Sequence, residues 1–387
     1  MNKKYSICII TTVAGSIKAF FLEQIEYLSN NGFEVTVICS EDEELRKILY
    51  DKVQYIAVDM KRGIDPIGGI RAILRMRRIF KENNFYIIQY STPNAAFYAS
   101  IASKLVKCKV RLYHNMGYRY LSFRGVKKNI FKTLEKITCR LSTEVQLVSL
   151  SNLEFGVNEK LFSSKKARII WNGSTGGVNL NRFSIRNRNE WRSEILNRYD
   201  IKDKFIFGFV GRITKDKGID ELLLAYKKFI KKYKESLLII VGVEDNTNLL
   251  NLELYRWAKT NKQILFVGRS EEVNKFFSAF DVLVLPSYRE GFGNVVIEAQ
   301  AMGTPVIVSN IPGPIDCIKN GMTGIVVPPK RSDLLFNAME DIYLNENRRE
   351  QMGTAAYKYI IECFDSRKLI HYILEDKKRL IKENYKK

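Results

Sequence analysis

Long apolar runs are missing from this sequence of 387 residues. No run approaches the roughly eighteen residues that a membrane-spanning helix needs. The opening Met1-Asn2-Lys3-Lys4 leads into a short expected strand, and not into the apolar region and cleavage site of a signal peptide. We therefore expect a cytosolic protein whose chain does not cross a membrane.

Metal-binding side chains are also scarce, with 2 histidines and 6 cysteines in the whole chain. The cysteines are spread out, without close pairs or metal-ligand spacing, and the sequence has no Asp-x-Asp motif. Cysteines placed in this way are typical of reduced core residues. We expect no metal and no resident cofactor.

Strands and helices are expected to alternate in both halves of the chain. At 46% hydrophobic and 27% charged residues, the composition is that of a globular protein long enough for two domains. A polar stretch at 181–189 marks the expected boundary near residue 185. The apolar runs predict strands at 5–12, 33–40, 85–90, 109–114, 205–210, 237–242, 264–267, 281–285, 305–308 and 324–327, and helices at 17–31, 68–83 and 125–142. The fold class is therefore α/β, with two Rossmann-like doubly wound parallel sheets.

The most informative motif lies at 290–298, where two glutamates flank two glycines directly after an apolar strand. Asn294 is a plausible N-cap for a helix that runs to about Met302. The open amide groups of a helix start favour an anion such as a diphosphate, and glycines let the backbone approach it. Glu290 and Glu298 would then accept hydrogen bonds from hydroxyl groups. This combination predicts a nucleotide sugar as ligand.

A second motif, Gly211-Arg212-Ile213-Thr214-Lys215-Asp216-Lys217-Gly218, lies on a strand-to-helix loop. Arg212 offers a planar fork and Lys217 a compact charge, so that together they could neutralise a departing nucleoside diphosphate. An arbitrary Arg and Lys would more often be solvated surface cations. The context of the two motifs favours the phosphate role.

In these two motifs the chain resembles the retaining glycosyltransferases of the GT-B fold called family 4, and over nearly its whole length it resembles the capsule and O-antigen transferases of that family. The resemblance implies residues 1–185 as an acceptor-side domain, 186–365 as a nucleotide-sugar-binding domain, and 366–387 as a helix that crosses back to the first domain. It also implies metal-independent transfer with retention, in which the leaving diphosphate itself takes the acceptor proton. The donor-binding residues that it implies are Gly15, Arg212, Lys217, Glu290, Gly291, Phe292, Gly293, Asn294, Val295 and Glu298.

Two residues of the first domain are further candidates. Many family members have histidine directly before a glycine at the place of Met116-Gly117, and here the imidazole is His114, two residues earlier. Both positions would share one face of a strand, so His114 could still reach the donor sugar and act in catalysis. A single histidine at a strand end is more often only hydrogen-bonded structure. Arg119 is a possible phosphate or acceptor contact.

The positive charge is concentrated in the first half. Residues 1–186 hold 30 Lys and Arg against 15 Asp and Glu, so that they carry most of the formal net charge of +21. Cations alternate with apolar residues in the helices expected at 68–83 and 125–142, which would give each helix a cationic face. This pattern favours contact with an anionic membrane surface, although such faces can also simply be solvated. No nucleic-acid motif is present.

The expected function is transfer of a hexose or N-acetyl amino sugar from a UDP-sugar to a lipid-linked saccharide, with polyprenyl diphosphate as the carrier. The enzyme would work in capsule, O-antigen or related surface-glycan synthesis, as a peripheral protein on the inner face of the cytoplasmic membrane. The alternatives are a UDP-sugar epimerase of similar fold and a noncatalytic polyanion-binding protein. The sequence leaves open the sugar, the acceptor, the linkage and the oligomeric state.

Overall fold

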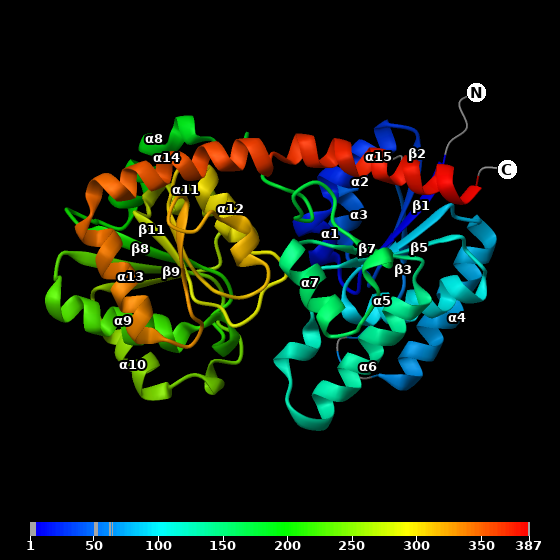
Figure 1. Ribbon diagram of the computed structural model, residues 1–387, viewed down its shortest axis with the longest axis horizontal. Helices are drawn as coiled ribbons and strands as arrows, with labels where there is room; N and C mark the ends of the chain where they lie inside the picture. The colour runs from blue at the N-terminus through cyan, green and yellow to red at the C-terminus, as the bar shows by residue number, and fades with distance from the viewer. Residues whose placement is uncertain (1–4, 50–52, 62, 64, 386–387) are drawn as a thin grey trace. The chain divides into compact units, whose positions relative to one another are not determined.

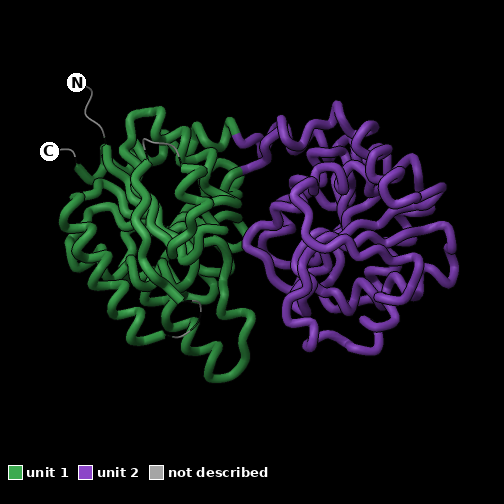
Figure 2. The backbone as a smooth tube through the Cα atoms, turned by 180° about the vertical axis from the view of Figure 1, so that it is seen from behind, with its two compact units in different colours: residues 1–176, 367–387 green, residues 177–366 purple. Residues whose placement is uncertain are grey.

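The computed structural model describes residues 5–49, 53–61, 63 and 65–385. The chain forms two compact units, of which unit 1 runs to Gly176 and resumes at Arg367, and unit 2 spans Gly177–Ser366 (Figure 2). Both units contain a fully parallel sheet covered by helices (Figure 1). The predicted α/β class with two Rossmann-like sheets is confirmed.

Unit 1 contains a seven-stranded sheet in the order β3-β2-β1-β4-β5-β6-β7. Its strands are β1 (Tyr5–Ile10), β2 (Phe33–Cys39), β3 (Val53–Ala57), β4 (Ile87–Tyr90), β5 (Val110–Asn115), β6 (Glu144–Leu147) and β7 (Ala167–Arg168). Its helices are α1 (Ala14–Phe20), α2 (Leu22–Asn30), α3 (Glu43–Ile48), α4 (Pro66–Asn83), α5 (Pro93–Leu105), η1 (Arg119–Ser122), α6 (Gly125–Leu141), α7 (Leu150–Asn158), η2 (Ser164–Lys166) and α15 (Ser366–Tyr385).

Both faces of this sheet are buried. Along β1, Ile7 and Ile9 belong to the core beneath α1, α2, α3 and α15, whereas Cys8 and Ile10 belong to the core beneath α4, α5 and α6. Successive side chains of a strand point to opposite faces, so a strand that is covered on both sides reads as one continuous apolar run. For this reason the apolar runs of the sequence predicted these strands.

Unit 2 contains a six-stranded sheet in the order β10-β9-β8-β11-β12-β13. Its strands are β8 (Phe205–Val210), β9 (Ser236–Val241), β10 (Ile264–Gly268), β11 (Val282–Leu285), β12 (Val306–Ser309) and β13 (Gly324–Val327). Its helices are η3 (Ile185–Asn187), α8 (Arg188–Arg198), η4 (Lys215–Lys217), α9 (Ile219–Lys232), η5 (Thr247–Leu249), α10 (Leu252–Thr260), α11 (Val273–Ala279), α12 (Asn294–Ala301), η6 (Pro314–Cys317), α13 (Ser332–Leu344) and α14 (Glu346–Cys363).

The chain passes from unit 1 to unit 2 earlier than the expected boundary at residue 185. The Ser174 amide donates to the Val148 carbonyl within unit 1, at 2.7 Å. A few residues later the Val178 amide donates to the Phe364 carbonyl within unit 2, at 2.8 Å. The bond of Val178 attaches the chain to the second unit, and the polar stretch that suggested the boundary lies inside unit 2.

The helix expected at 17–31 is two helices, α1 and α2, which meet at Phe21. Phe21 has a φ of −122° outside the helical range, and its buried ring packs edge-on against His114, with 5.5 Å between ring centroids. Apolar periodicity continues across the break, so the sequence pattern did not reveal it.

The last helix, α15, packs on unit 1. Leu374, Leu380 and Ile381 join the core beneath α1 and α2. Lys377 is completely buried, with its Nζ 3.2 Å from Gln146 Oε1 on β6. In the part of the chain that the structure describes, no helix is both long and apolar enough to cross a membrane.

Candidate functional site

The loop that carries Arg212 and Lys217 joins β8 to α9 in unit 2. Its last turn is η4, and Gly218 is the N-cap of α9, with a φ of +71°. Glycine adopts this left-handed conformation without strain, whereas other residues do so at a cost. The predicted position of both cations on a strand-to-helix loop is correct.

The second motif lies on the next loop of the same sheet edge, between β11 and α12. Because β8 and β11 are parallel neighbours, the loops that follow them leave from the same edge. Lys217 Nζ lies 2.5 Å from Glu290 Oε1, and the same oxygen accepts a hydrogen bond from Ser287 Oγ at 2.9 Å. The structure therefore brings together the cation of one motif and the first carboxylate of the other.

Backbone contacts hold the two loops against each other. The Tyr288 amide donates to the Asp216 carbonyl at 2.8 Å. A Cβ placed on Gly218 would lie only 2.0 Å from the Pro286 carbonyl oxygen. Gly218 thus serves both the turn and the close approach of the loops.

Asp216 and Arg289 also join the loops, and the sequence reasoning gave neither of them a role. Arg289 Nη2 lies 3.1 Å from Asp216 Oδ2. Burial acts to raise the pKa of Asp216, but the hydrogen bond from Thr214 and the charge of Arg289 outweigh it, so the pKa lies below its ordinary value. Asp216 lies inside the motif at 211–218 and Arg289 lies directly before the motif at 290–298, and these positions were the only available signal.

Arg212 does not point at Glu290. Its guanidinium Nη1 lies 2.5 Å from Asp245 Oδ2, and half of its side chain is exposed. Asp245 follows β9, the other neighbour of β8 in the sheet. Arg212 and Lys217 therefore both have carboxylate partners, on opposite sides of the loop that carries them.

The start of α12 differs from the prediction in its cap. The N-cap is Gly293, with a φ of +108°, and Asn294 is the first helical residue. Asparagine was expected to cap with its side chain, but Gly293 can take the left-handed backbone that this entry requires. The Asn294 and Val295 amides begin the helix and have no partner one turn earlier within it, so they retain the anion-binding character of a helix start.

Phe292 can contribute to a ligand site only through its backbone. Its side chain is 5% exposed and packs on Phe364, with ring centroids 5.5 Å apart. Cys317 Sγ donates to the Phe292 carbonyl at 3.3 Å. A Cβ on Gly313 would lie 2.9 Å from the Gly291 carbonyl oxygen. Gly313 precedes η6, so the start of η6 packs closely against the loop between β11 and α12.

Glu298 lies one turn into α12 and is partly buried. Burial raises the pKa of its carboxyl to about 7, and the charge of Arg182 opposes this rise. With this pKa the carboxyl is protonated in part of the molecules at physiological pH, so it can accept or donate hydrogen bonds.

His114 lies inside unit 1. It is 1% exposed, and its Nε2 is 3.2 Å from Thr175 Oγ1. Burial and the charge of Lys377 lower its pKa to about 3, so the ring is neutral at physiological pH. Its Nδ1 has no hydrogen-bond partner among the residues that the structure describes. This burial is the ordinary structural outcome for a strand histidine and gives the ring no access to a ligand in this conformation.

The other two candidates of unit 1 are more open. Gly15 is exposed in the first turn of α1, and a Cβ built there would meet no atom of the described residues within 4 Å. Arg119 begins η1, with its guanidinium carbon 5.4 Å from the Phe131 ring centroid. Among the described residues, no cluster of His, Cys, Asp and Glu could hold a metal ion.

Two family matches together span most of the chain. Residues 192–359, in unit 2, match the glycosyl transferases group 1, and residues 6–149, in unit 1, match the glycosyl transferase 4-like family. The first match includes both motif loops, from Gly211 to Glu298.

Individual proteins extend these matches. The chain is 30% identical over 366 residues to the capsular polysaccharide biosynthesis glycosyltransferase CapM of Staphylococcus aureus, with 94% of each chain covered. It is 26% identical over 324 residues to the Escherichia coli UDP-Gal:alpha-D-GlcNAc-diphosphoundecaprenol alpha-1,3-galactosyltransferase, with 82% of each covered. A crystal structure of a Rickettsia africae glycosyltransferase superposes with a TM-score of 0.80 at 22% identity, over 99% of this chain and 100% of that one. This last likeness shows the fold, and the expected GT-B fold is confirmed.

Proposed function

The chain belongs to the group 1 glycosyltransferases, and from this premise we propose that it transfers a hexose or an N-acetyl amino sugar from a UDP-sugar to a polyprenyl-diphosphate-linked saccharide. The transfer retains the configuration of the sugar and needs no metal. The product enters a capsule, an O-antigen or a related surface glycan. The E. coli relative, whose printed name includes both UDP-galactose and a diphosphoundecaprenol acceptor, supports this choice of substrates.

One observation carries the donor assignment, namely the contact between Lys217 and Glu290. It places a cation suited to phosphate beside a carboxylate suited to sugar hydroxyls, close to the start of α12. A ligand with adjacent anionic and hydroxylated parts matches this arrangement, and a nucleotide sugar has both. The nucleotide diphosphate would accept hydrogen bonds from the Asn294 and Val295 amides.

In the proposed reaction, the bond between the anomeric carbon and the diphosphate oxygen breaks as the acceptor hydroxyl attacks from the same face. The released diphosphate oxygen takes the acceptor proton. Arg212 and Lys217 stabilise the negative charge that develops on the leaving group. This scheme assigns no proton transfer to His114, whose buried neutral ring instead holds Thr175.

The other site residues have the following proposed contacts with the two substrates. Glu290 accepts hydrogen bonds from the donor sugar, and Glu298 from the ribose. Gly15 leaves room for the diphosphate because it has no side chain. On the acceptor side, Arg119 provides a positive charge in unit 1.

We also propose that the protein works at the inner face of the cytoplasmic membrane. Unit 1 exposes cations along α4 and α6, among them Arg71, Arg75, Lys127 and Lys136. Anionic headgroups attract such a surface, with each cation contributing on the order of 1 kcal/mol.

A transfer assay tests the proposal. Purified protein is incubated with UDP-sugars and GDP-sugars, first alone and then with a polyprenyl-diphosphate-linked saccharide, with and without EDTA. NMR of the product reports the anomeric configuration. Isomerisation of the UDP-sugar without acceptor would support the epimerase alternative. Salt-sensitive polyanion binding without UDP affinity would support the noncatalytic one.

A further inference from the structure

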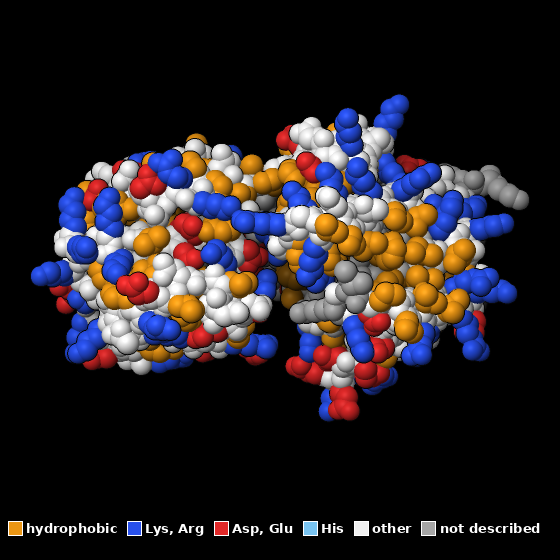
Figure 3. Space-filling view, turned by 90° about the horizontal axis from the view of Figure 1, so that it is seen from below, with side chains coloured by type: hydrophobic (Ala, Val, Ile, Leu, Met, Phe, Trp, Pro, Cys, Tyr) orange, Lys and Arg blue, Asp and Glu red, His pale blue; other side chains and the backbone are white. Residues whose placement is uncertain are grey.

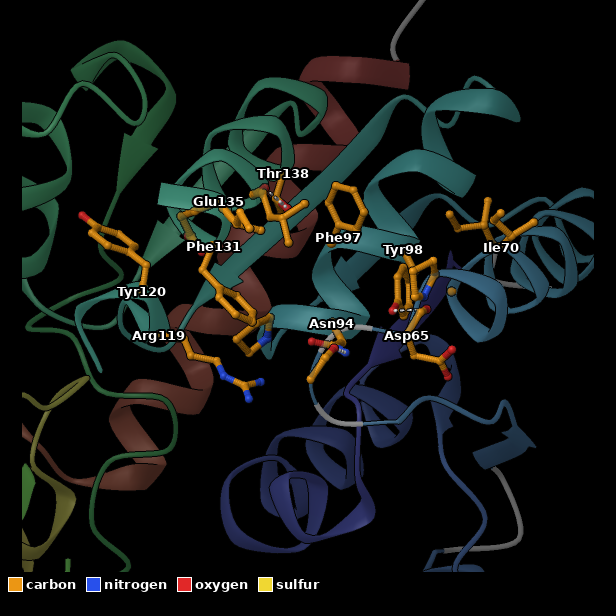
Figure 4. A pocket seen from close by; sticks show the side chains of 17 residues that line it. Asp65, Ile70, Asn94, Phe97, Tyr98, Arg119, Tyr120, Phe131, Glu135 and Thr138 are labelled. Atoms are coloured by element: carbon orange, nitrogen blue, oxygen red, sulfur yellow. Dashed lines mark hydrogen bonds between the residues drawn. The ribbon is translucent and has the colours of Figure 1, made fainter. Parts of the chain in front are cut away.

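A cavity of about 290 Å³ opens in unit 1, between the helices α4, α5 and α6 and the short helix η1. Its lining residues belong to unit 1, whereas the motif loops belong to unit 2. Figure 4 shows side chains of all four elements around it, including Ile70 from α4, Phe97 from α5, Phe131 from α6 and Arg119 from η1. The proposed donor site uses none of the apolar residues of this cavity.

An occupant of the cavity would meet mostly carbon, because the polar groups around it bond to the protein. Asn94 Nδ2 donates to the carbonyls of Lys61 and Gly63, both at 2.7 Å. The Glu135 carboxyl accepts from Tyr113 at 2.9 Å and from Asn115 at 2.8 Å. The apolar lining includes Ile70, Ile73, Phe97, Ile130, Phe131 and Leu134.

The apolar lining continues onto the surface of the same helices. Ile70 is 60% exposed on α4 and Ile130 is 43% exposed on α6, although both line the cavity. Their neighbours Ile67 and Val126 are more exposed still, at 68% and 75%. Figure 3 shows a broad apolar patch on this unit with Lys and Arg side chains around it. A contiguous apolar patch of this kind on a soluble domain marks an interaction surface.

Positive charge accompanies this apolar lining. The guanidinium of Arg119 lies beside Phe131 at one side of the cavity, as Figure 4 shows. The helices α4 and α6 also carry exposed cations, among them Arg71 and Lys127. The complementary ligand is therefore an amphiphile with an apolar chain and an anionic group.

We propose that the cavity binds the first isoprene units of a polyprenyl diphosphate, and that Arg119 contacts its diphosphate. This inference rests on the proposed function, which makes such a lipid the carrier of the acceptor. A volume of 290 Å³ lies at the small end of ligand pockets, which span roughly 300–1,000 Å³, so the cavity would hold a short part of the chain. The rest of the chain would follow the exposed faces of α4 and α6 into the bilayer.

Titration with farnesyl diphosphate tests the cavity without any glycosyl transfer. Calorimetry should show that the wild-type protein binds farnesyl diphosphate at least tenfold more tightly than inorganic pyrophosphate. Leu134→Trp, which fills the cavity, should weaken farnesyl diphosphate binding by tenfold or more. Leu105→Trp is the matched control, since Leu105 is an exposed residue of α5 outside the cavity lining and should leave binding unchanged.

Two further variants complete the test, one at the rim of the cavity and one at the charged residue. Ile130→Trp alters the partly exposed rim and supports the same conclusion if Leu134→Trp fails to fold. Arg119→Gln should weaken binding of farnesyl diphosphate while leaving farnesol binding unchanged, because only the diphosphate needs the charge.

The proposal is overturned if pyrophosphate binds as tightly as farnesyl diphosphate, or if neither Trp substitution in the cavity weakens binding. It is also overturned if these substitutions reduce only the binding to phosphatidylglycerol vesicles, since the cavity would then hold bilayer acyl chains. UDP titration of the same samples separates the two proposals. Absence of UDP binding by the wild-type protein would contradict the donor site in unit 2, whereas the part of the farnesyl diphosphate affinity that Leu134→Trp removes reports on the cavity in unit 1.

Discussion

Lys217 and Glu290, which are 73 positions apart in the sequence, form an ion pair with 2.5 Å between Nζ and Oε1. Both side chains are mostly buried, with exposed fractions of 17% and 14%. The Glu290 carboxylate occupies a place at which a phosphate oxygen could meet the lysine. Binding of a diphosphate would therefore exchange one anionic partner of Lys217 for another.

We expect Lys217→Ala and Arg212→Ala each to lower the rate of sugar transfer by about 100- to 1,000-fold, the usual cost of removing one group that stabilises developing charge. Initial rates with saturating UDP-sugar and lipid-linked acceptor measure this effect. Lys215→Ala is the matched control, because Lys215 lies on the same loop but is 56% exposed and 3.9 Å from its nearest carboxylate. Full activity in both Lys217→Ala and Arg212→Ala would contradict the assignment of Lys217 and Arg212 to the diphosphate.

Glu290→Ala should weaken binding of the UDP-sugar more than binding of UDP. Glu290 is proposed to contact the sugar, and its loss also frees Lys217 to meet the phosphates. Calorimetry with both ligands gives the two dissociation constants. The dissociation constant of UDP divided by that of the UDP-sugar should fall by about tenfold, or about 1.4 kcal/mol, toward one. An equal loss for both ligands would show that Glu290 does not recognise the sugar.

Gly218→Ala should separate the two motif loops and reduce UDP affinity. The added Cβ would meet the Pro286 carbonyl oxygen at 2.0 Å, and the left-handed backbone adds strain of about 1–3 kcal/mol. Gly268→Ala in the same unit is the control, since Gly268 has a φ of +79° but, within the described part of the chain, no atom lies within 4 Å of the new Cβ. Thermal unfolding measures the strain that both variants share, and UDP titration measures the effect specific to Gly218. Equal UDP affinity in the two variants would argue against a site built on the contact between the loops.

UDP affinity should rise between pH 6 and pH 8 because of Glu298. Its pKa of about 7 means that the carboxyl becomes ionised over this range, and an ionised carboxylate accepts stronger hydrogen bonds from ribose hydroxyls. Glu298→Gln cannot ionise and should lack this rise. The titration of UDP itself affects the wild-type protein and Glu298→Gln equally. The ratio of their two dissociation constants for UDP therefore reports on Glu298 alone, and it should change by about three- to tenfold between pH 6 and pH 8. A ratio that is constant with pH would contradict the ribose assignment.

The sequence predicted the elements of the two sheets better than the helix ends. Each strand of unit 2 was expected within a residue or so of its observed bounds, because buried parallel strands are continuous apolar runs. The break at Phe21 and the glycine cap at Gly293 were missed, since both depend on backbone angles that the apolar pattern does not encode. The short helix α3 and the strand β3 carry weaker patterns and were not assigned.

The amino-acid sequence alone determined the fold class, the family and the two loops that carry the motifs, because the spacing of glycines, cations and carboxylates is a local property of the chain. Only the tertiary structure decided which of these residues meet. It paired Lys217 with Glu290, turned Arg212 toward Asp245 and buried His114 against Thr175. The physical reason is that such contacts depend on the order of strands in a sheet and on the packing of side chains between elements. Residues that are distant in the sequence become neighbours only when the sheet forms.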